Sequence, residues 1–228
     1  MNAMDQLERK AWLSVGRFMA ALAVMIFGAA WSVAYWQGWL FWLVLGAGIV
    51  FVTAYFLRHD RALVERRMRA GPTAEVRRQQ KLIQTVVTAL LLVTLFGSIL
   101  DHRYGWSSVP AEAVIGGNVL IAMSFVIIFV VFRENSFAAA IVDIKEGQRV
   151  VDTGPYALVR HPMYSGALLM FAGTPLALGS LWGLLPAALL TAGLVWRLID
   201  EERYLVEHLP GYAEYRTRVR YRLLPGLW

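Results

Sequence analysis

Cysteine is absent from this 228-residue sequence. Disulfide bonds, a thiolate nucleophile and cysteine ligands for a metal are therefore excluded. Histidine is scarce, and its four copies are scattered without the spacing of a metal site, so we expect no bound metal. The pattern G-x-G-x-x-G is also missing, which argues against a soluble α/β cofactor-binding domain.

Apolar residues, by contrast, make up 58% of the sequence and gather in long runs. Most runs reach or approach the ~20 residues that a helix needs to cross a bilayer. The first is too long for the core of a signal peptide, so we expect it to remain as a span. We predict an all-α, polytopic helical membrane protein with about six spans, at residues 11–36, 38–57, 82–100, 111–132, 164–178 and 181–199. The last two, of which the first is short and interrupted, are expected to form a helical hairpin.

The basic residues are distributed unevenly around a net charge of +6. Eight Arg or Lys residues lie in the loop 58–81, four in 133–160 and five after the last apolar run, whereas the opposite connections carry only Arg103. Basic loops accumulate on the cytoplasmic side, so we predict that both termini and these segments are cytoplasmic. This topology explains the charge without a nucleic-acid partner. Arginine outnumbers lysine nineteen to three, which indicates a GC-rich genome and hence a bacterial inner membrane.

The chain divides at about residue 132. Residues 1–132 read as a transmembrane scaffold of four spans with the basic cytoplasmic loop 58–81, which we expect to be helical and to lie on lipid headgroups. In residues 133–228, polar residues are interleaved with apolar ones both before and after the terminal hairpin. Because a hairpin returns its exit close to its entrance, we expect these two polar segments to meet in a cytoplasmic pocket.

The first polar segment contains "GPYALVRHPMYSG" at 154–166. Gly154 and Pro155 predict a turn. Pro162 suits the first position of a helix, which makes His161 the N-cap. The unpaired N–H groups of such a helix start attract a carboxylate or phosphate, and Arg160 would strengthen that attraction. The alternative interpretation is an ordinary interfacial boundary of a membrane span.

The second polar segment begins near the end of the last apolar run. Arg197 and Glu201 are four residues apart and share one helix face, while Glu202 is turned about 100° away. Carboxylates so close to the bilayer are costly unless they serve a site. Further along, Tyr212, Tyr215 and Val219 form a helical stripe, which we interpret as an amphipathic interfacial helix rather than part of a binding site.

These elements together resemble the isoprenylcysteine carboxyl methyltransferase and phospholipid methyltransferase superfamily, whose members are integral membrane enzymes that use S-adenosyl-L-methionine. The resemblance covers residues 133–228 and rests on the order G-P-Y, R-H-P-x-Y-x-G, a hairpin, R-x-x-x-E-E-x-x-L and a Tyr-rich tail that ends in Pro. Relatives often carry a Gln shortly after the residue corresponding to Asn135, whereas 136–147 has none and offers Lys145. The cofactor-binding residues that it implies, with Arg160 added as the anion-attracting neighbour, are Asn135, Gln148, Arg149, Val150, Val151, Arg160, Tyr156, His161, Pro162, Met163, Tyr164 and Glu201.

The resemblance also implies that the protein transfers a methyl group from this cofactor to a lipophilic acceptor at the cytoplasmic membrane face. Arg197 would line the acceptor side and orient a carboxylate acceptor. An amine or thiol acceptor must lose a proton, to Glu202, His161 or a tyrosine. The sequence does not choose among a carboxylate, an amine and a thiol, nor does it reveal the oligomeric state.

Two other interpretations stay open at this point. A membrane NADPH-dependent reductase of the sterol-reductase type shares an R-H-P-x-Y-like element, although it usually has a Glu where this chain has Ala167. A non-enzymatic membrane protein is the second alternative, and transport would require ionisable groups in mid-membrane that the apolar runs largely lack.

Overall fold

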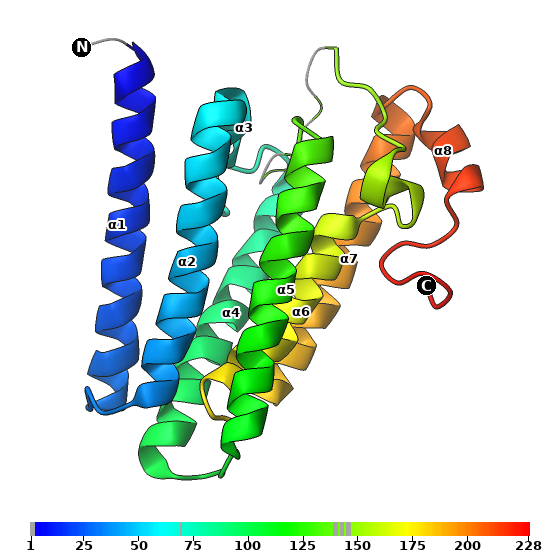
Figure 1. Ribbon diagram of the computed structural model, residues 1–228. Helices are drawn as coiled ribbons and strands as arrows, with labels where there is room; N and C mark the ends of the chain where they lie inside the picture. The colour runs from blue at the N-terminus through cyan, green and yellow to red at the C-terminus, as the bar shows by residue number, and fades with distance from the viewer. Residues whose placement is uncertain (1–2, 69, 139–140, 142–143, 145–146) are drawn as a thin grey trace.

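The computed structural model describes residues 3–68, 70–138, 141, 144 and 147–228, and the side chains from residue 6 onward within those ranges. The described residues form helices and connecting segments and contain no strand, as expected for an all-α protein. The helices are α1 Ala3–Ala30, α2 Trp36–His59, α3 Arg61–Met68, α4 Arg78–Tyr104, α5 Ala111–Glu134, the short 3-10 helix η1 Gly154–Ala157, α6 Pro162–Ala177, α7 Leu184–His208 and α8 Tyr212–Arg218 (Figure 1).

Four of the described helices are long and apolar enough to cross a membrane, namely α1, α2, α4 and α5. The expectation of about six spans is not confirmed. Helix α6 has only 16 residues, about 24 Å of helix against a hydrocarbon core of about 30 Å. Helix α7 has 25 residues, but its last third carries several charged side chains. The expected hairpin does form, with α6 running into α7 through a short connection (Figure 1).

The hairpin packs against the rest of the bundle through both of its helices. Helix α6 makes its most extensive contact with α5, and α7 makes its own with α4. The crossing of α5 and α6 depends on glycine, because a Cβ added to Gly117 would lie 2.4 Å from the backbone nitrogen of Ala177 and 2.7 Å from the carbonyl oxygen of Gly173. Glycine allows such a close backbone approach. This contact fixes the end of α6 against the first part of α5.

The loop 58–81 is only partly helical. Helix α3 covers its first part, residues 70–77 form a non-helical connection, and α4 begins at Arg78. The end of α2, the whole of α3, the start of α4 and the helix α8 gather at the same end of the bundle as the N-terminus (Figure 1). We call this the basic end of the molecule, since the described parts of the three basic segments lie there.

Candidate active site

The polar segment before the hairpin adopts the local structure that its residues predict. Gly154 has a φ of +55° and opens η1, with Pro155 in its first turn. A side chain at residue 154 would also collide with the carboxylate of Glu134. Helix α6 then begins at Pro162 with His161 as its N-cap, which confirms the predicted helix start. The tail reinforces this turn, because the Tyr215 hydroxyl donates to the carbonyl oxygen of Tyr156 over 2.7 Å.

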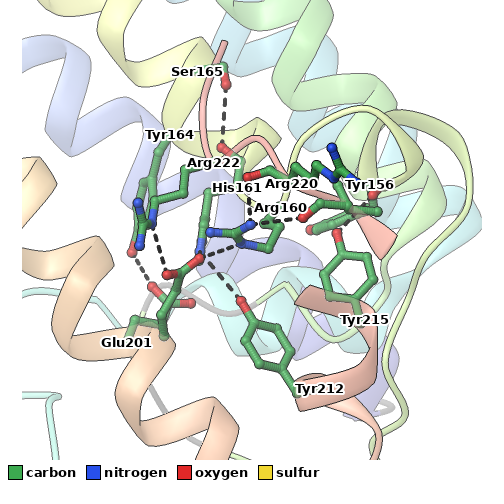
Figure 2. Close-up of polar contacts among 12 residues, drawn as sticks. Tyr156, Arg160, His161, Tyr164, Ser165, Glu201, Tyr212, Tyr215, Arg220 and Arg222 are labelled. Atoms are coloured by element: carbon green, nitrogen blue, oxygen red, sulfur yellow. Dashed lines mark hydrogen bonds and ion pairs between the residues drawn. The ribbon is translucent and has the colours of Figure 1, made fainter. Parts of the chain in front are cut away.

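The chain after α8 folds back over the start of α6 and is held there by backbone hydrogen bonds. The N–H groups of Arg160 and His161 donate to the carbonyl oxygens of Tyr221 and Arg222, each over 2.9 Å. The Ser165 hydroxyl donates to the carbonyl oxygen of Leu223 over 2.6 Å (Figure 2). The guanidinium of Arg160 adds two bonds of 2.8 Å, to the carbonyl oxygens of residues 219 and 220. The two polar segments, remote in sequence, are therefore in direct contact.

Glu202 links the same segments through its side chain. One oxygen of its buried carboxylate accepts from Arg160 Nε over 2.6 Å and lies 3.2 Å from His161 Nε2. The other oxygen accepts from Arg222 Nε over 2.9 Å. These hydrogen bonds lower the pKa of Glu202 far below its ordinary value, although burial alone would raise it. Two arginines against one carboxylate leave a net positive charge beside the start of α6.

Glu201 occupies a different environment one residue earlier. It is only partly buried, and it accepts a hydrogen bond of 2.5 Å from the hydroxyl of Tyr164 (Figure 2). The same hydroxyl accepts a bond of 3.1 Å from Arg197 Nε. Arg197 in turn forms a buried ion pair of 2.7 Å with Glu75 and donates to Gln84 over 2.8 Å. Two adjacent acidic residues of α7 thus enter two separate polar networks.

A cavity at the basic end is bordered by both polar segments. Its wall includes the loop 148–151, the turn of η1, the first turn of α6 and the last turns of α7. All twelve residues predicted to contact a cofactor border this one cavity: Asn135, Gln148, Arg149, Val150, Val151, Tyr156, Arg160, His161, Pro162, Met163, Tyr164 and Glu201. The structure therefore brings this whole set together. Lys145, raised as the possible replacement for a missing Gln, lies outside the described residues.

The two residues predicted to act in catalysis, Arg197 and Glu202, are both described and lie behind the wall of this cavity rather than in it. Arg197 faces α4 and the 70–77 connection through Gln84 and Glu75. Glu202 is surrounded by its basic partners. Arg197 supports Tyr164, and Glu202 supports Arg160. Both supported residues border the cavity.

Sequence reasoning missed the contribution of the tail to the cavity. Tyr212 and Tyr215 border it, together with Leu205 and Leu209 at the end of α7. Both tyrosines are almost completely buried, 4% and 1% exposed, so the tyrosine stripe packs against the protein core and is not a membrane-facing surface. The interfacial interpretation of α8 was wrong for this face. The stripe itself was the signal, because a helix face with two tyrosines suits a polar pocket as well as a lipid interface.

A second cavity lies next to the first, between α1, α2, α3 and the end of α5. Most of its lining is apolar, including Val15, Val52, Phe56 and Phe132. Arg67 of α3 also lines it, and burial lowers the pKa of this guanidinium to about 10. Arg67 Nη1 lies 3.5 Å from the sulfur of Met163, and Met163 borders the first cavity. The two cavities therefore meet at this pair of side chains.

Comparison with known proteins adds one positive finding. The family model described as phospholipid methyltransferase matches residues 113–211, which include most of α5, all of η1, α6 and α7, and most of the cavity wall. This match is consistent with the resemblance inferred from the two polar segments. No curated protein matches the chain significantly.

Proposed function

We propose, from the membership of residues 113–211 in the phospholipid methyltransferase family, that this integral membrane protein is an S-adenosyl-L-methionine-dependent methyltransferase of the isoprenylcysteine carboxyl methyltransferase-like type. Family membership indicates a membrane methyltransferase that acts on a lipid-type substrate. The observation that carries the finer proposal is the single cavity that both polar segments border. The acceptor would be lipophilic, and transfer would take place at the cytoplasmic face of a bacterial inner membrane.

The residues around the cavity suit the charges of this methyl donor. The donor carries a carboxylate, an ammonium and a sulfonium, and it supplies the methyl group. The net positive charge of Arg160, Glu202 and Arg222, together with the start of α6, would attract the carboxylate. Glu201 offers its own carboxylate to the cationic groups. Rings such as those of Tyr156 and Tyr164 attract cations through their faces.

Glu202 fits a positioning role better than the role of a proton acceptor. A carboxylate with a strongly lowered pKa, bonded to two arginines and a histidine, is a weak base. Its removal would release Arg160 and with it the tail that closes the site. The rate of methyl transfer would come mainly from alignment of the acceptor and from exclusion of water, to which the buried Tyr212 and Tyr215 contribute.

The second cavity suits the apolar part of the acceptor. Its lining of aliphatic and aromatic side chains offers little to a water-soluble molecule. An amphiphile in it could place its polar group beside Arg67 and Met163. These residues lie at the wall shared with the first cavity, which we call the donor cavity. An acceptor with an anionic group, such as a phosphate or carboxylate, would be attracted to Arg67.

The direct test incubates the detergent-purified protein with radiolabelled S-adenosyl-L-methionine and total membrane extract. We expect label in a product that partitions into organic solvent, and its identification names the acceptor. Glu201→Gln should abolish most of the transfer, whereas Glu207→Gln, on the exposed surface of the same helix, should retain it. Absence of transfer with every extract, combined with thermal protection by NADPH and none by the methyl donor, would favour the reductase alternative.

A further inference from the structure

The connection between α3 and α4 contributes a buried carboxylate to the support of the site. Glu75 lies in this connection, well before the residues matched by the family, and only 2% of it is exposed. Its Oε1 atom accepts a hydrogen bond of 2.7 Å from Arg197 Nη2. A buried carboxylate is costly unless it is paired, so this ion pair must be formed whenever the connection is in place.

The ion pair continues into the donor cavity through two further hydrogen bonds. Arg197 Nε donates to the Tyr164 hydroxyl over 3.1 Å, and that hydroxyl donates to Glu201 Oε2 over 2.5 Å. Tyr164 and Glu201 both border the donor cavity, whereas Glu75 and Arg197 do not. We call the series of contacts from Glu75 through Arg197 and Tyr164 to Glu201 the relay. Figure 2 shows its last step, with the ring of Tyr164 directed at Glu201. Glu75 is thus connected to the cavity without touching it.

Carboxylates and guanidinium groups of the described residues alternate along the relay. Glu75 and Glu201 are the two carboxylates, and Arg197 is one of two guanidinium groups beside them. Arg67 is the other, close enough to Arg197 for the two cations to repel each other. Loss of the negative charge of Glu75 would make these surroundings more positive, next to the place where a cationic donor must bind. Arg197 would then be drawn toward Glu201, the remaining carboxylate on its side.

We infer that Glu75 is a positioning residue that sets the preference of the site for the positively charged methyl donor over its neutral product. It holds Arg197 on Tyr164 and so leaves Glu201 free to face a cation. This inference rests on the proposed function. It assigns part of the support of the donor site to the N-terminal half of the chain, outside the residues matched by the family.

The test compares the binding of S-adenosyl-L-methionine and S-adenosyl-L-homocysteine, which lacks the sulfonium charge, by calorimetry. Glu75→Gln keeps a hydrogen-bond acceptor for Arg197 but removes the charge. We expect it to weaken binding of the charged donor about tenfold, the size of one charge-assisted hydrogen bond, and binding of the neutral product by less than about twofold. Tyr164→Phe, which interrupts the relay without removing a charge, should shift the preference in the same direction and decides the test if Glu75→Gln does not fold.

Asp200→Asn is the matched control. Asp200 is also buried, and it pairs with Arg77 of the same connection over 2.9 Å, but it is not part of the relay. It should lower thermal stability while leaving the ratio of the two affinities unchanged. A wild-type ratio in both Glu75→Gln and Tyr164→Phe would overturn the inference. Failure of the wild-type protein to bind either ligand would instead overturn the proposed function.

Discussion

Among single side chains, that of Glu202 joins the two polar segments of the site. One carboxylate oxygen accepts a hydrogen bond from Arg160 and the other accepts one from Arg222. Arg160 also donates to a backbone carbonyl of the tail. Removing one partner of a buried ion cluster typically costs about 3–5 kcal/mol, because the remaining charges stay buried. The charge of Glu202 therefore contributes to folding stability as well as to the geometry of the site.

This contribution depends on pH in a defined direction. The folded protein lowers the pKa of Glu202 below the ordinary value of 4.5, so the stabilisation is complete above that value and is lost as the pH falls below it. We expect Glu202→Gln to lower the melting temperature in detergent at pH 7, and the gap to wild type to narrow progressively as the pH falls from about 5 to about 3. A gap that stays constant over this range would show that the charge of Glu202 contributes nothing to stability.

Sequence reasoning succeeded at this scale where a residue's role follows from its neighbours in the chain. Pro162 and His161 began a helix as predicted, and Gly154 took the left-handed conformation of a turn. It could not foresee that the guanidinium of Arg160 is committed to Glu202 and to the tail. That commitment depends on a segment about sixty residues away, whose path no local pattern specifies.

At the scale of elements, the close crossing of α5 and α6 sets the position of the site. The first turn of α6 carries Tyr164 and Met163, so a shift of this helix would displace part of the cavity wall. The crossing allows no side chain at Gly117, whereas Gly116 on the neighbouring face has open space around its Cβ position. The two adjacent glycines thus form a natural matched pair.

We expect substitution by alanine to have opposite effects at Gly116 and Gly117. Gly116→Ala should stabilise the protein slightly, by up to about 1 kcal/mol, because alanine favours a helix more than glycine does. Gly117→Ala should destabilise it by about 1–3 kcal/mol, because the new methyl group meets the backbone of α6. Thermal unfolding in detergent, followed by circular dichroism, measures both. Equal effects of the two substitutions would contradict the packing described for α5 and α6.

The lengths of α6 and α7 show why the number of spans was difficult to predict. The apolar run at 164–178 corresponds to a helix of 16 residues that ends just after Pro175. Helix α7 begins at Leu184 and continues beyond the apolar run to His208, where charged residues replace apolar ones. Hydrophobicity identifies both segments as buried in an apolar environment, but it does not distinguish burial against α4 and α5 from exposure to lipid.

For the whole molecule, the basic residues and the site lie at one end of the bundle. The segments of α3, the connection 70–77 and α8 lie around the cavities there, while the last turn of α4, which carries Arg103, lies at the other end of the bundle (Figure 1). If basic loops face the cytoplasm, as in most membrane proteins, a water-soluble donor enters from that side. Both termini would then be cytoplasmic.

The absence of native cysteine allows a direct test of this orientation. Thr73 lies in the exposed part of the basic end, and Ser108 is exposed in the connection between α4 and α5. We expect Ser108→Cys in intact bacterial cells to react with a membrane-impermeant maleimide, and Thr73→Cys to react only after the inner membrane is permeabilised. The reverse pattern would place the cavities on the outer side of the membrane, where a methyl donor in the cytoplasm could not reach them.

We propose that the two polar segments around residues 148–164 and 197–215 bind one molecule of S-adenosyl-L-methionine between them. The most direct measurement is a calorimetric titration of the detergent-purified protein with this donor, in the wild type and in one variant of each segment, Tyr156→Leu and Glu201→Gln. We expect wild-type binding in the micromolar range, an order of magnitude ordinary for enzymes, and at least about tenfold weaker binding in each variant. Wild-type affinity in both folded variants would contradict the claim.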